Sequence, residues 1–167
     1  IIGAGLQARL QLEALTLVRK INTAYIWSRD TNKASKFVEE IKYLNLNLEV
    51  CSSVEEVLEK SEIVITTTPS KTPLIKSDWL KKGLHITAMG SDAEQKNELD
   101  PAIIKDCNLY VPDSLSQTAI LGELHHAIEK NIVSSDSFYN ELGNVILDFN
   151  LGRKNKDDIT VCDLTGT

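Results

Sequence analysis

Residues 1–8 of the chain, Ile1-Ile2-Gly3-Ala4-Gly5-Leu6-Gln7-Ala8, decide which fold the rest of the sequence can adopt. Two β-branched residues run into a G-x-G-x-x-A motif, and apolar residues then recur at mostly helical spacing up to Arg19. Between a strand and a helix, this motif is typical of dinucleotide-binding proteins, because its glycines allow a tight turn and a close approach of the backbone to a pyrophosphate. The alternative is a plain structural turn. We expect a cofactor's phosphates to be bound by the motif residues Gly3, Gly5, Leu6, Gln7 and Ala8.

Beyond this motif, strand signals alternate with helix signals along the chain. We expect strands at 24–27, 46–50, 62–67, 84–88 and 109–111 and a last one from Ile159. Helices are expected at 32–43, 53–60, 77–82 and 101–106, followed by a mainly helical region at 113–149 with a break around 133–136. This alternation predicts the α/β class, with a doubly wound, mainly parallel Rossmann-type sheet and helices on both faces.

Composition limits the function classes. The chain has 167 residues, about one domain, with 42% hydrophobic and 25% charged residues. Its net charge of −6 argues against binding to nucleic acid or to an anionic membrane. The cysteines Cys51, Cys107 and Cys162 are widely spaced and form no ligand motif, which indicates a reducing compartment, and the cytoplasm is the expected location.

The end of the expected second strand indicates which cofactor is bound. An acidic residue that binds the adenosine ribose is typical there of NAD-dependent proteins, but this sequence has Ser28 and Arg29, followed by Asp30. A hydroxyl and a guanidinium suit a 2′-phosphate, so the pattern modestly favours NADP over NAD. A shift of two residues would instead make Asp30 the acidic residue, and a solvated Arg-Asp pair is the third interpretation.

Several separated motifs together resemble those of one family. These motifs are residues 3–8, Trp27-Ser28-Arg29-Asp30, Thr66-Thr67-Thr68-Pro69, residues 88–99, Gly122-Glu123-Leu124-His125-His126 and Asp163-Leu164-Thr165-Gly166. With them the whole chain resembles the ornithine cyclodeaminase/mu-crystallin family, in particular its branch associated with ectoine utilisation. The resemblance implies that residues 1–167 are the NAD(P)-binding domain of a homodimeric enzyme. The domain for substrate binding and dimerisation is expected to precede Ile1 and to be largely absent from this chain.

The resemblance also implies an acid–base residue. The family pattern G-x-D-x-P-G-K-x-E-L corresponds to residues 90–99, which places the catalytic aspartate at Asp92, the family lysine at Lys96 and the family glutamate at Glu98. The family's Pro-Gly is replaced here by Glu94-Gln95. By residue type alone, Asp92 would be a turn former. As a catalyst it would exchange a proton with a substrate amine or imine.

Two further segments are expected to face the cofactor. The hydroxyl or N–H groups of Thr67 and Thr68 are candidates for contact with its ribose or pyrophosphate, with a plain strand-ending turn as the alternative. Ala88, Met89 and Gly90 are expected beside the nicotinamide, with Gly90 allowing close approach. Lys96 is included among the cofactor-binding residues. Near the C-terminus, many relatives have Ser where this chain has Leu164, so a hydroxyl contact comes from Thr165 or is lost.

The implied activity is NAD(P)-dependent hydride transfer between the α-carbon of a small amino acid, or of its imine, and nicotinamide. With ornithine as substrate this becomes deamination with cyclisation, a lyase reaction of amino-acid metabolism. The alternatives are an imine or ketimine reductase, an amino-acid dehydrogenase, or a mu-crystallin-like protein that binds NADP and a small ligand. We expect no metal, because His125 and His126 are adjacent on a helix, point about 100° apart, and have no third spaced ligand.

Overall fold

Residues 1–3 form a very short central strand of the fold, in which Ile2 makes the pairing contacts. Ile2 pairs in parallel with Trp27 on one side and with Thr66 on the other. Its N–H donates to the Ile65 carbonyl at 2.8 Å, and its carbonyl accepts from the Thr67 N–H at 2.8 Å. This short segment therefore joins a two-stranded and a four-stranded sheet into one parallel sheet.

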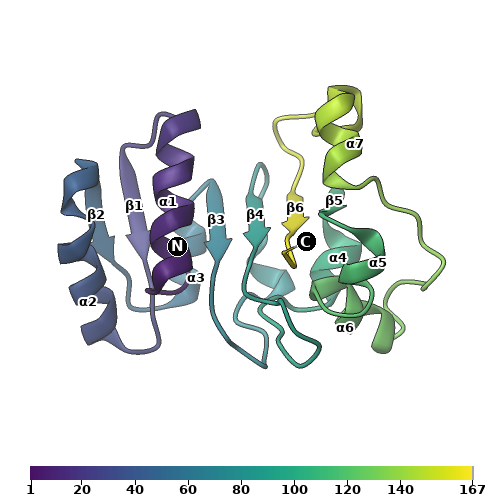
Figure 1. Cartoon of the computed structure of the whole chain (residues 1–167), viewed down its shortest axis with the longest axis horizontal. Coiled ribbons are helices and arrows are strands. Elements are labelled where there is room, and N and C mark those ends of the chain that lie inside the picture. Colours follow the sequence, from purple (N-terminus) through teal and green to yellow (C-terminus); the bar gives the residue numbers. More distant parts are fainter. Residues whose placement is uncertain (167) are drawn as a thin grey trace.

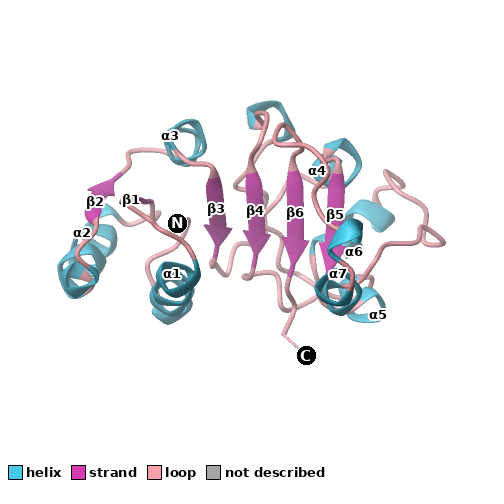
Figure 2. Ribbon diagram, turned by 90° about the horizontal axis from the view of Figure 1, so that it is seen from above, coloured by secondary structure: helices cyan, strands magenta, loops and turns pink. Residues whose placement is uncertain are grey.

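The computed structural model describes residues 1–166. Its strands are β1 (Thr23–Ile26), β2 (Asn47–Val50), β3 (Ile63–Thr66), β4 (His85–Ala88), β5 (Leu109–Pro112) and β6 (Thr160–Asp163). Across the sheet they lie in the order β2-β1, then residues 1–3, then β3-β4-β6-β5, and every pairing is parallel. Figure 2 shows this order along the sheet, and the prediction of a doubly wound α/β fold is confirmed.

Helices cover both faces of this sheet. They are α1 (Leu6–Val18), α2 (Thr31–Glu40), α3 (Val54–Lys60), α4 (Ala102–Asp106), α5 (Leu115–Thr118), α6 (Glu123–Glu129) and α7 (Leu142–Leu147), with 3-10 turns η1 (Lys42–Leu44), η2 (Ser77–Trp79) and η3 (Phe149–Leu151). In Figure 2, α1, α2 and α7 lie on one side of the sheet and α3 and α4 on the other. Figure 1 shows the loops that follow β3 and β4 at one edge of the sheet.

Alternating residues of the strands fill two apolar cores, one on each face. In β3, Val64 belongs to the larger core and its neighbour Ile65 to the smaller one, because successive side chains of a strand point to opposite faces. The smaller core lies under α1 and α2 and includes Leu12 and Phe37. The sheet is thus held by burial on both sides, as parallel sheets require.

Local signals explain where the helices begin. Ser53 Oγ accepts the Glu56 N–H at 3.1 Å at the start of α3, as the capping motif predicts. Asp100 Oδ1 accepts the Ala102 N–H at 3.0 Å at the start of α4. The cap of α3 confirms the predicted beginning of that helix, whereas α4 begins at Ala102, one residue later than predicted, with Pro101 at its N-cap.

The region 113–149 is less helical than expected. Its helices α5, α6 and α7 are short, and irregular chain separates α6 from α7 over a longer stretch than the predicted break at 133–136. The apolar residues of this stretch are spaced as in a helix, but many of them pack on the core from loops, among them Ile132, Val133 and Tyr139. The expected helix at 77–82 is likewise only the 3-10 turn η2.

One sheet face carries a groove between α1 and α7. The groove has a volume of about 1120 Å³ and is lined by Leu15 and Val18 of α1, Val145 of α7, and Ile65, Thr87 and Cys162 of the sheet, among others. In Figure 2 the ribbon shows no helix over this part of the sheet. Within residues 1–166, no helix is both long and apolar enough to cross a membrane.

Candidate functional site

The first βα turn has the geometry that its glycines predict. Gly3 has a φ of +121°, which side chains rarely allow, and a Cβ there would lie 2.4 Å from Thr67 Oγ1. The Gly3 N–H donates to the Trp27 carbonyl at 2.8 Å, so the turn is fixed to two neighbouring strand ends. Gly3 is thus required by the backbone and by the packing of Thr67.

The second glycine faces open space at the N-terminus of α1. A Cβ at Gly5 would meet no atom within 4 Å, and no side chain caps the 13-residue helix that Gly5 begins. The N–H groups of the first helical turn therefore remain available to an anion, whereas Ala8 is buried and lets the helix pack closely on the sheet. These features fit the diphosphate of a dinucleotide.

The end of β1 places Ser28, Arg29 and Asp30 beside this corner. Asp30 caps α2, and its Oδ1 accepts the N–H groups of Asn32 at 2.9 Å and Lys33 at 3.4 Å. The carboxylate of Asp30 thus has a structural role already. Arg29 is exposed and has no hydrogen-bond or ion-pair partner within residues 1–166, so its guanidinium is free to bind another group.

The loops after β3 and β4 are joined through Glu98, which the sequence analysis noted only as the family glutamate. Glu98 Oε1 accepts the N–H and the hydroxyl of Thr68, at 2.5 and 2.7 Å. Glu98 Oε2 accepts the Gly90 N–H at 2.8 Å. A Cβ at Gly90 would lie 2.3 Å from the Thr68 carbonyl oxygen and 2.5 Å from Glu98 Cδ.

These contacts involve two residues expected at the cofactor, Thr68 and Gly90, and their contacts with the cofactor stay a prediction. In this structure both the N–H and the hydroxyl of Thr68 donate to Glu98 Oε1. The close approach that Gly90 allows is to Thr68 and Glu98. The hydroxyl of Thr67 donates to the Ile2 carbonyl at 3.2 Å, beside the Gly3 turn.

Asp92 and Lys96 form an ion pair in the loop after β4. The side chain of Asp92 is 52% exposed and that of Lys96 is 26% exposed, so the carboxylate is open to solvent and to a second reactant. The loop begins where the Met89 N–H donates to the Thr66 carbonyl at 3.0 Å, at the edge of the sheet that also carries the Gly3 turn. The structure thus places the family aspartate and lysine together at the carboxyl edge of the strands.

Ala88 and Met89 lead from β4 into this loop. Ala88 is fully buried and its carbonyl accepts the Leu164 N–H at 2.9 Å. Met89 is partly buried and packs against the smaller core under α1 and α2. The backbone of this segment is therefore fixed on both sides before it reaches Asp92.

Two further buried carboxylates, not singled out by the sequence analysis, support this edge. Asp163 ends β6 and its Oδ2 accepts the Tyr110 hydroxyl at 2.7 Å and the Glu123 N–H at 2.8 Å. Glu123 Oε1 in turn accepts the Glu98 N–H at 2.9 Å. Burial raises the pKa of Asp163 to about 7, and raises the pKa of Glu98 and Glu123 for the same reason. In the sequence, the position of Asp163 at the end of an apolar strand could have indicated a buried carboxylate.

The hydroxyl of Thr165 is held by protein groups. It donates to Asp113 Oδ1 at 3.1 Å or to Gln117 Oε1 at 3.1 Å, and Asp113 Oδ2 also accepts the N–H groups of Thr165 and Gly166. A contact between this hydroxyl and the cofactor stays a prediction.

Comparison with known proteins identifies the same family as the motifs. The sequence model described as the ornithine cyclodeaminase/mu-crystallin family matches residues 1–167. The chain is 52% identical over its full length to the uncharacterized cyclodeaminase y4tK of Sinorhizobium fredii, of which it covers 51%. It is 34% identical to an alanine dehydrogenase of Archaeoglobus fulgidus over 99% of the chain and 50% of that protein. The chain spans about half the length of the curated relatives it matches.

Solved structures have the same fold. An archaeal alanine dehydrogenase dimer with bound NAD superposes with a TM-score of 0.91 at 34% identity, over 99% of this chain and 51% of that one. The Thermococcus litoralis Δ1-pyrroline-2-carboxylate reductase, in complex with NADH and L-proline, gives a TM-score of 0.92 at 29% identity, over 99% and 51% of the two chains. Both matches extend over nearly the entire chain.

Proposed function

The chain belongs to the ornithine cyclodeaminase/mu-crystallin family, and from this premise we propose that it is the NAD(P)-binding domain of an enzyme that interconverts a small α-amino acid and its imine. Its relatives include an alanine dehydrogenase and reductases of ketimines, iminosuccinate and pyrroline-2-carboxylate. The observation that carries the proposal is the open corner at Gly5, which lies at the same edge of the sheet as the Asp92 loop.

In this proposal the cofactor's phosphates are held by the first βα corner. The N–H groups of Leu6 and Gln7 face the diphosphate where Gly5 leaves space, and Gly3 and Ala8 give the turn and the close helix packing. Ser28 and Arg29 at the end of β1 bind the adenosine ribose or its 2′-phosphate. Bound NAD or NADH in solved relatives supports a nicotinamide cofactor, and Arg29 favours NADP here.

Asp92 is the proposed acid–base residue. The nicotinamide supplies the chemistry of accepting a hydride from the substrate's α-carbon or returning it there. When an amino acid is oxidised to its imine, the amine nitrogen must also lose a proton, and the exposed Asp92 carboxylate is placed to take it. Lys96 orients this carboxylate through their ion pair.

An ornithine cyclodeaminase is the second candidate, favoured by the 52% identity to a protein that is named an uncharacterized cyclodeaminase. There the terminal amine of the substrate attacks the imine carbon, ammonia leaves, and the hydride is returned, so that proline forms without net redox change. The chain's residues would have the same roles in both reactions.

The remaining expectations concern the intact protein. Its other half would supply the substrate contacts and the dimer interface, and the solved alanine dehydrogenase dimer supports a homodimer. Location in the cytoplasm stays a prediction from the cysteine pattern, in accord with Cys51, Cys107 and Cys162 as free thiols.

The test is to assay the full-length protein with small amino acids, ornithine and cyclic imines, and with each cofactor. Net change in the absorbance of reduced nicotinamide identifies a dehydrogenase or reductase. Release of ammonia from ornithine without such a change identifies the cyclodeaminase. Cofactor binding without turnover of any of these substrates would overturn the enzymatic proposal and leave a binding protein.

A further inference from the structure

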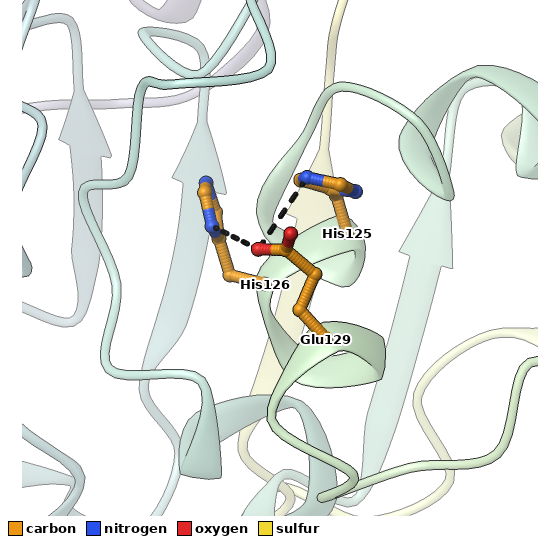
Figure 3. Close-up of side chains that lie close together, drawn as sticks. All are labelled: His125, His126 and Glu129. Carbon is orange, nitrogen blue, oxygen red and sulfur yellow. Dashed lines mark ion pairs between the residues drawn. The ribbon is translucent and has the colours of Figure 1, made fainter.

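Three side chains near the start and end of α6 converge outside the proposed active site. Glu129 lies four residues after His125 and three after His126, so its carboxylate reaches both rings from the next helical turn (Figure 3). Glu129 Oε2 is 3.5 Å from His125 Nε2 and 3.7 Å from His126 Nδ1. All three candidate ligand atoms lie within 4.8 Å of one another.

The other nitrogen of each ring identifies the tautomer. His125 Nδ1 lies 3.3 Å from the Ala119 carbonyl oxygen, and His126 Nε2 lies 2.6 Å from the Lys96 carbonyl oxygen. A carbonyl only accepts, so these two nitrogens carry the hydrogens. In a neutral imidazole the remaining nitrogen then has a lone pair, and here both lone pairs face the Glu129 carboxylate.

Two lone pairs and an anionic oxygen repel one another unless a positive charge lies between them. A histidine that binds a metal through one nitrogen usually donates the other N–H to a backbone carbonyl or a carboxylate, as both rings do here. Bond lengths of about 2.0–2.2 Å in a tetrahedral zinc site put its ligand atoms about 3.3–3.6 Å apart. The two N···O distances of 3.5 and 3.7 Å are close to this requirement.

We propose that His125 Nε2, His126 Nδ1 and Glu129 Oε2 bind a divalent transition-metal ion of the Zn²⁺ class, with a fourth position open to water. Imidazole nitrogen favours such ions over Mg²⁺ or Ca²⁺, which prefer oxygen ligands. The site is accessible, because the Glu129 side chain is 60% exposed and the imidazoles are 15% and 13% exposed. The three ligand atoms lie within 4.8 Å of one another, so binding of the ion draws the two rings as well as the exposed carboxylate together.

The Glu129 carboxylate is the ligand that the sequence analysis did not count when it predicted no metal. Through His126 the ion would also fix the Lys96 carbonyl, and with it the loop between β4 and α4. Binding of the ion does not depend on the proposed enzymatic function and can be measured without any substrate.

The test is a titration of the metal-stripped, full-length protein with Zn²⁺ against a chromophoric chelator. We expect one ion per chain at this site, and at least a tenfold loss of affinity in His125→Gln and in Glu129→Gln. Glu62→Gln, which changes an exposed carboxylate on another element, is the matched control and should bind as the parent does. Thermal unfolding of the metal-free variants verifies that each is folded.

Substitution with Co²⁺ separates this site from the free thiols. The proposed ligands contain no sulfur, so the spectrum should show d–d bands that disappear in Glu129→Gln, without a thiolate charge-transfer band. Unchanged affinity and stoichiometry in both variants would place the ion elsewhere and overturn the proposal. If the parent protein takes up no ion at this site, the proposal is overturned as well.

Discussion

At the scale of single residues, we propose that Arg29 decides between the two nicotinamide cofactors. Its guanidinium is exposed at the end of β1 without a partner in the described part of the chain, while the neighbouring Asp30 caps α2. A free guanidinium can donate two parallel hydrogen bonds to a phosphate. A ribose hydroxyl presents it with only one uncharged acceptor oxygen.

We expect Arg29→Ala to weaken NADP(H) about 10–100-fold, the value of one or two hydrogen bonds to a charged group, and to leave NAD(H) nearly unchanged. Fluorescence titration of the full-length protein with both reduced cofactors measures this. Lys36→Ala, which removes an exposed charge farther along α2, is the control and should affect neither. Equal losses for the two cofactors would remove the argument for a phosphate contact.

Asp92 is the second residue whose substitution gives a specific prediction, because its effect on kcat can be separated from any effect on cofactor binding. We expect Asp92→Asn to lower kcat by about 10²–10⁴-fold, the usual contribution of a positioned acid or base, because an amide cannot take the substrate's proton. The dissociation constant for cofactor should stay within a few-fold of the parent value. Glu94→Gln, an exposed carboxylate in the same loop, is the matched control. Near-parental turnover in Asp92→Asn would mean that another group moves the proton.

At the scale of elements, the loops after β3 and β4 depend on the absence of a side chain at Gly90. We expect Gly90→Ala to cost about 1–3 kcal/mol in the free energy of unfolding, because the new methyl group would overlap Thr68 and Glu98. Gly143→Ala in α7 meets no atom within 4 Å and should stabilise the protein by about 0.5–1 kcal/mol through helix propensity. Urea unfolding measures the change in the free energy of unfolding for both variants. No loss of stability in Gly90→Ala would contradict the packing described for this loop.

The buried Asp163 carboxyl group at the end of β6 makes the free energy of unfolding depend on pH. Burial raises the pKa of Asp163 from 3.8 to about 7, so the folded state holds a proton that the unfolded state has released between these values. The resulting stabilisation is complete below about pH 4 and is lost as the pH rises through 7. We expect the contribution of Asp163 to the free energy of unfolding to fall by about 4 kcal/mol over this range, at 1.36 kcal/mol per unit of pKa shift.

Asp163→Asn should flatten this dependence, because an amide does not titrate. Urea unfolding at several pH values between 4 and 8 measures it, with Asp136→Asn, an exposed carboxylate, as the control that should keep the parental slope. The slope that remains in Asp163→Asn includes Glu98 and Glu123, whose pKa values are also raised by burial, and His85, whose pKa burial lowers to about 4 and whose effect has the opposite sign. An unchanged slope in Asp163→Asn would show that this carboxyl group does not carry the effect.

Elements with a strong local signal were predictable from the sequence. The β-branched run at 62–67 became β3, and the G-x-G-x-x-A motif became the turn into α1, because short-range sterics and capping decide such segments. The region 113–149 was not predictable in this way. Its apolar residues satisfy a helical period, but tertiary packing against Tyr110 and Leu124 leaves much of it irregular.

The candidate site, too, was predictable from the sequence only in part. Family motifs indicated Asp92 and Lys96, and the structure places them in contact. The roles of Glu98 and Glu123 could not be read from the sequence, because their partners lie 25–30 residues away along the chain. Long-range hydrogen bonds of this kind follow from the three-dimensional arrangement of the strand ends.

At the scale of the whole molecule, a parallel sheet brings the functional groups to one edge. The turn after residues 1–3 and the loops after β3 and β4 are linked by backbone hydrogen bonds at the carboxyl ends of these strands. Such an edge is where open α/β sheets bind their ligands. The chain spans about half the length of its curated relatives, and we propose that the other half of the intact protein supplies the opposite wall of the active site.

The most direct test of this account is the crystal structure of the full-length protein with NADP⁺ or NAD⁺ bound. We predict that the diphosphate lies against the N–H groups of Leu6 and Gln7 in front of Gly5, and that the nicotinamide ring lies next to the Asp92 loop. A cofactor bound away from Gly5, or a ring too distant from Asp92 for both to contact one substrate, would contradict the account.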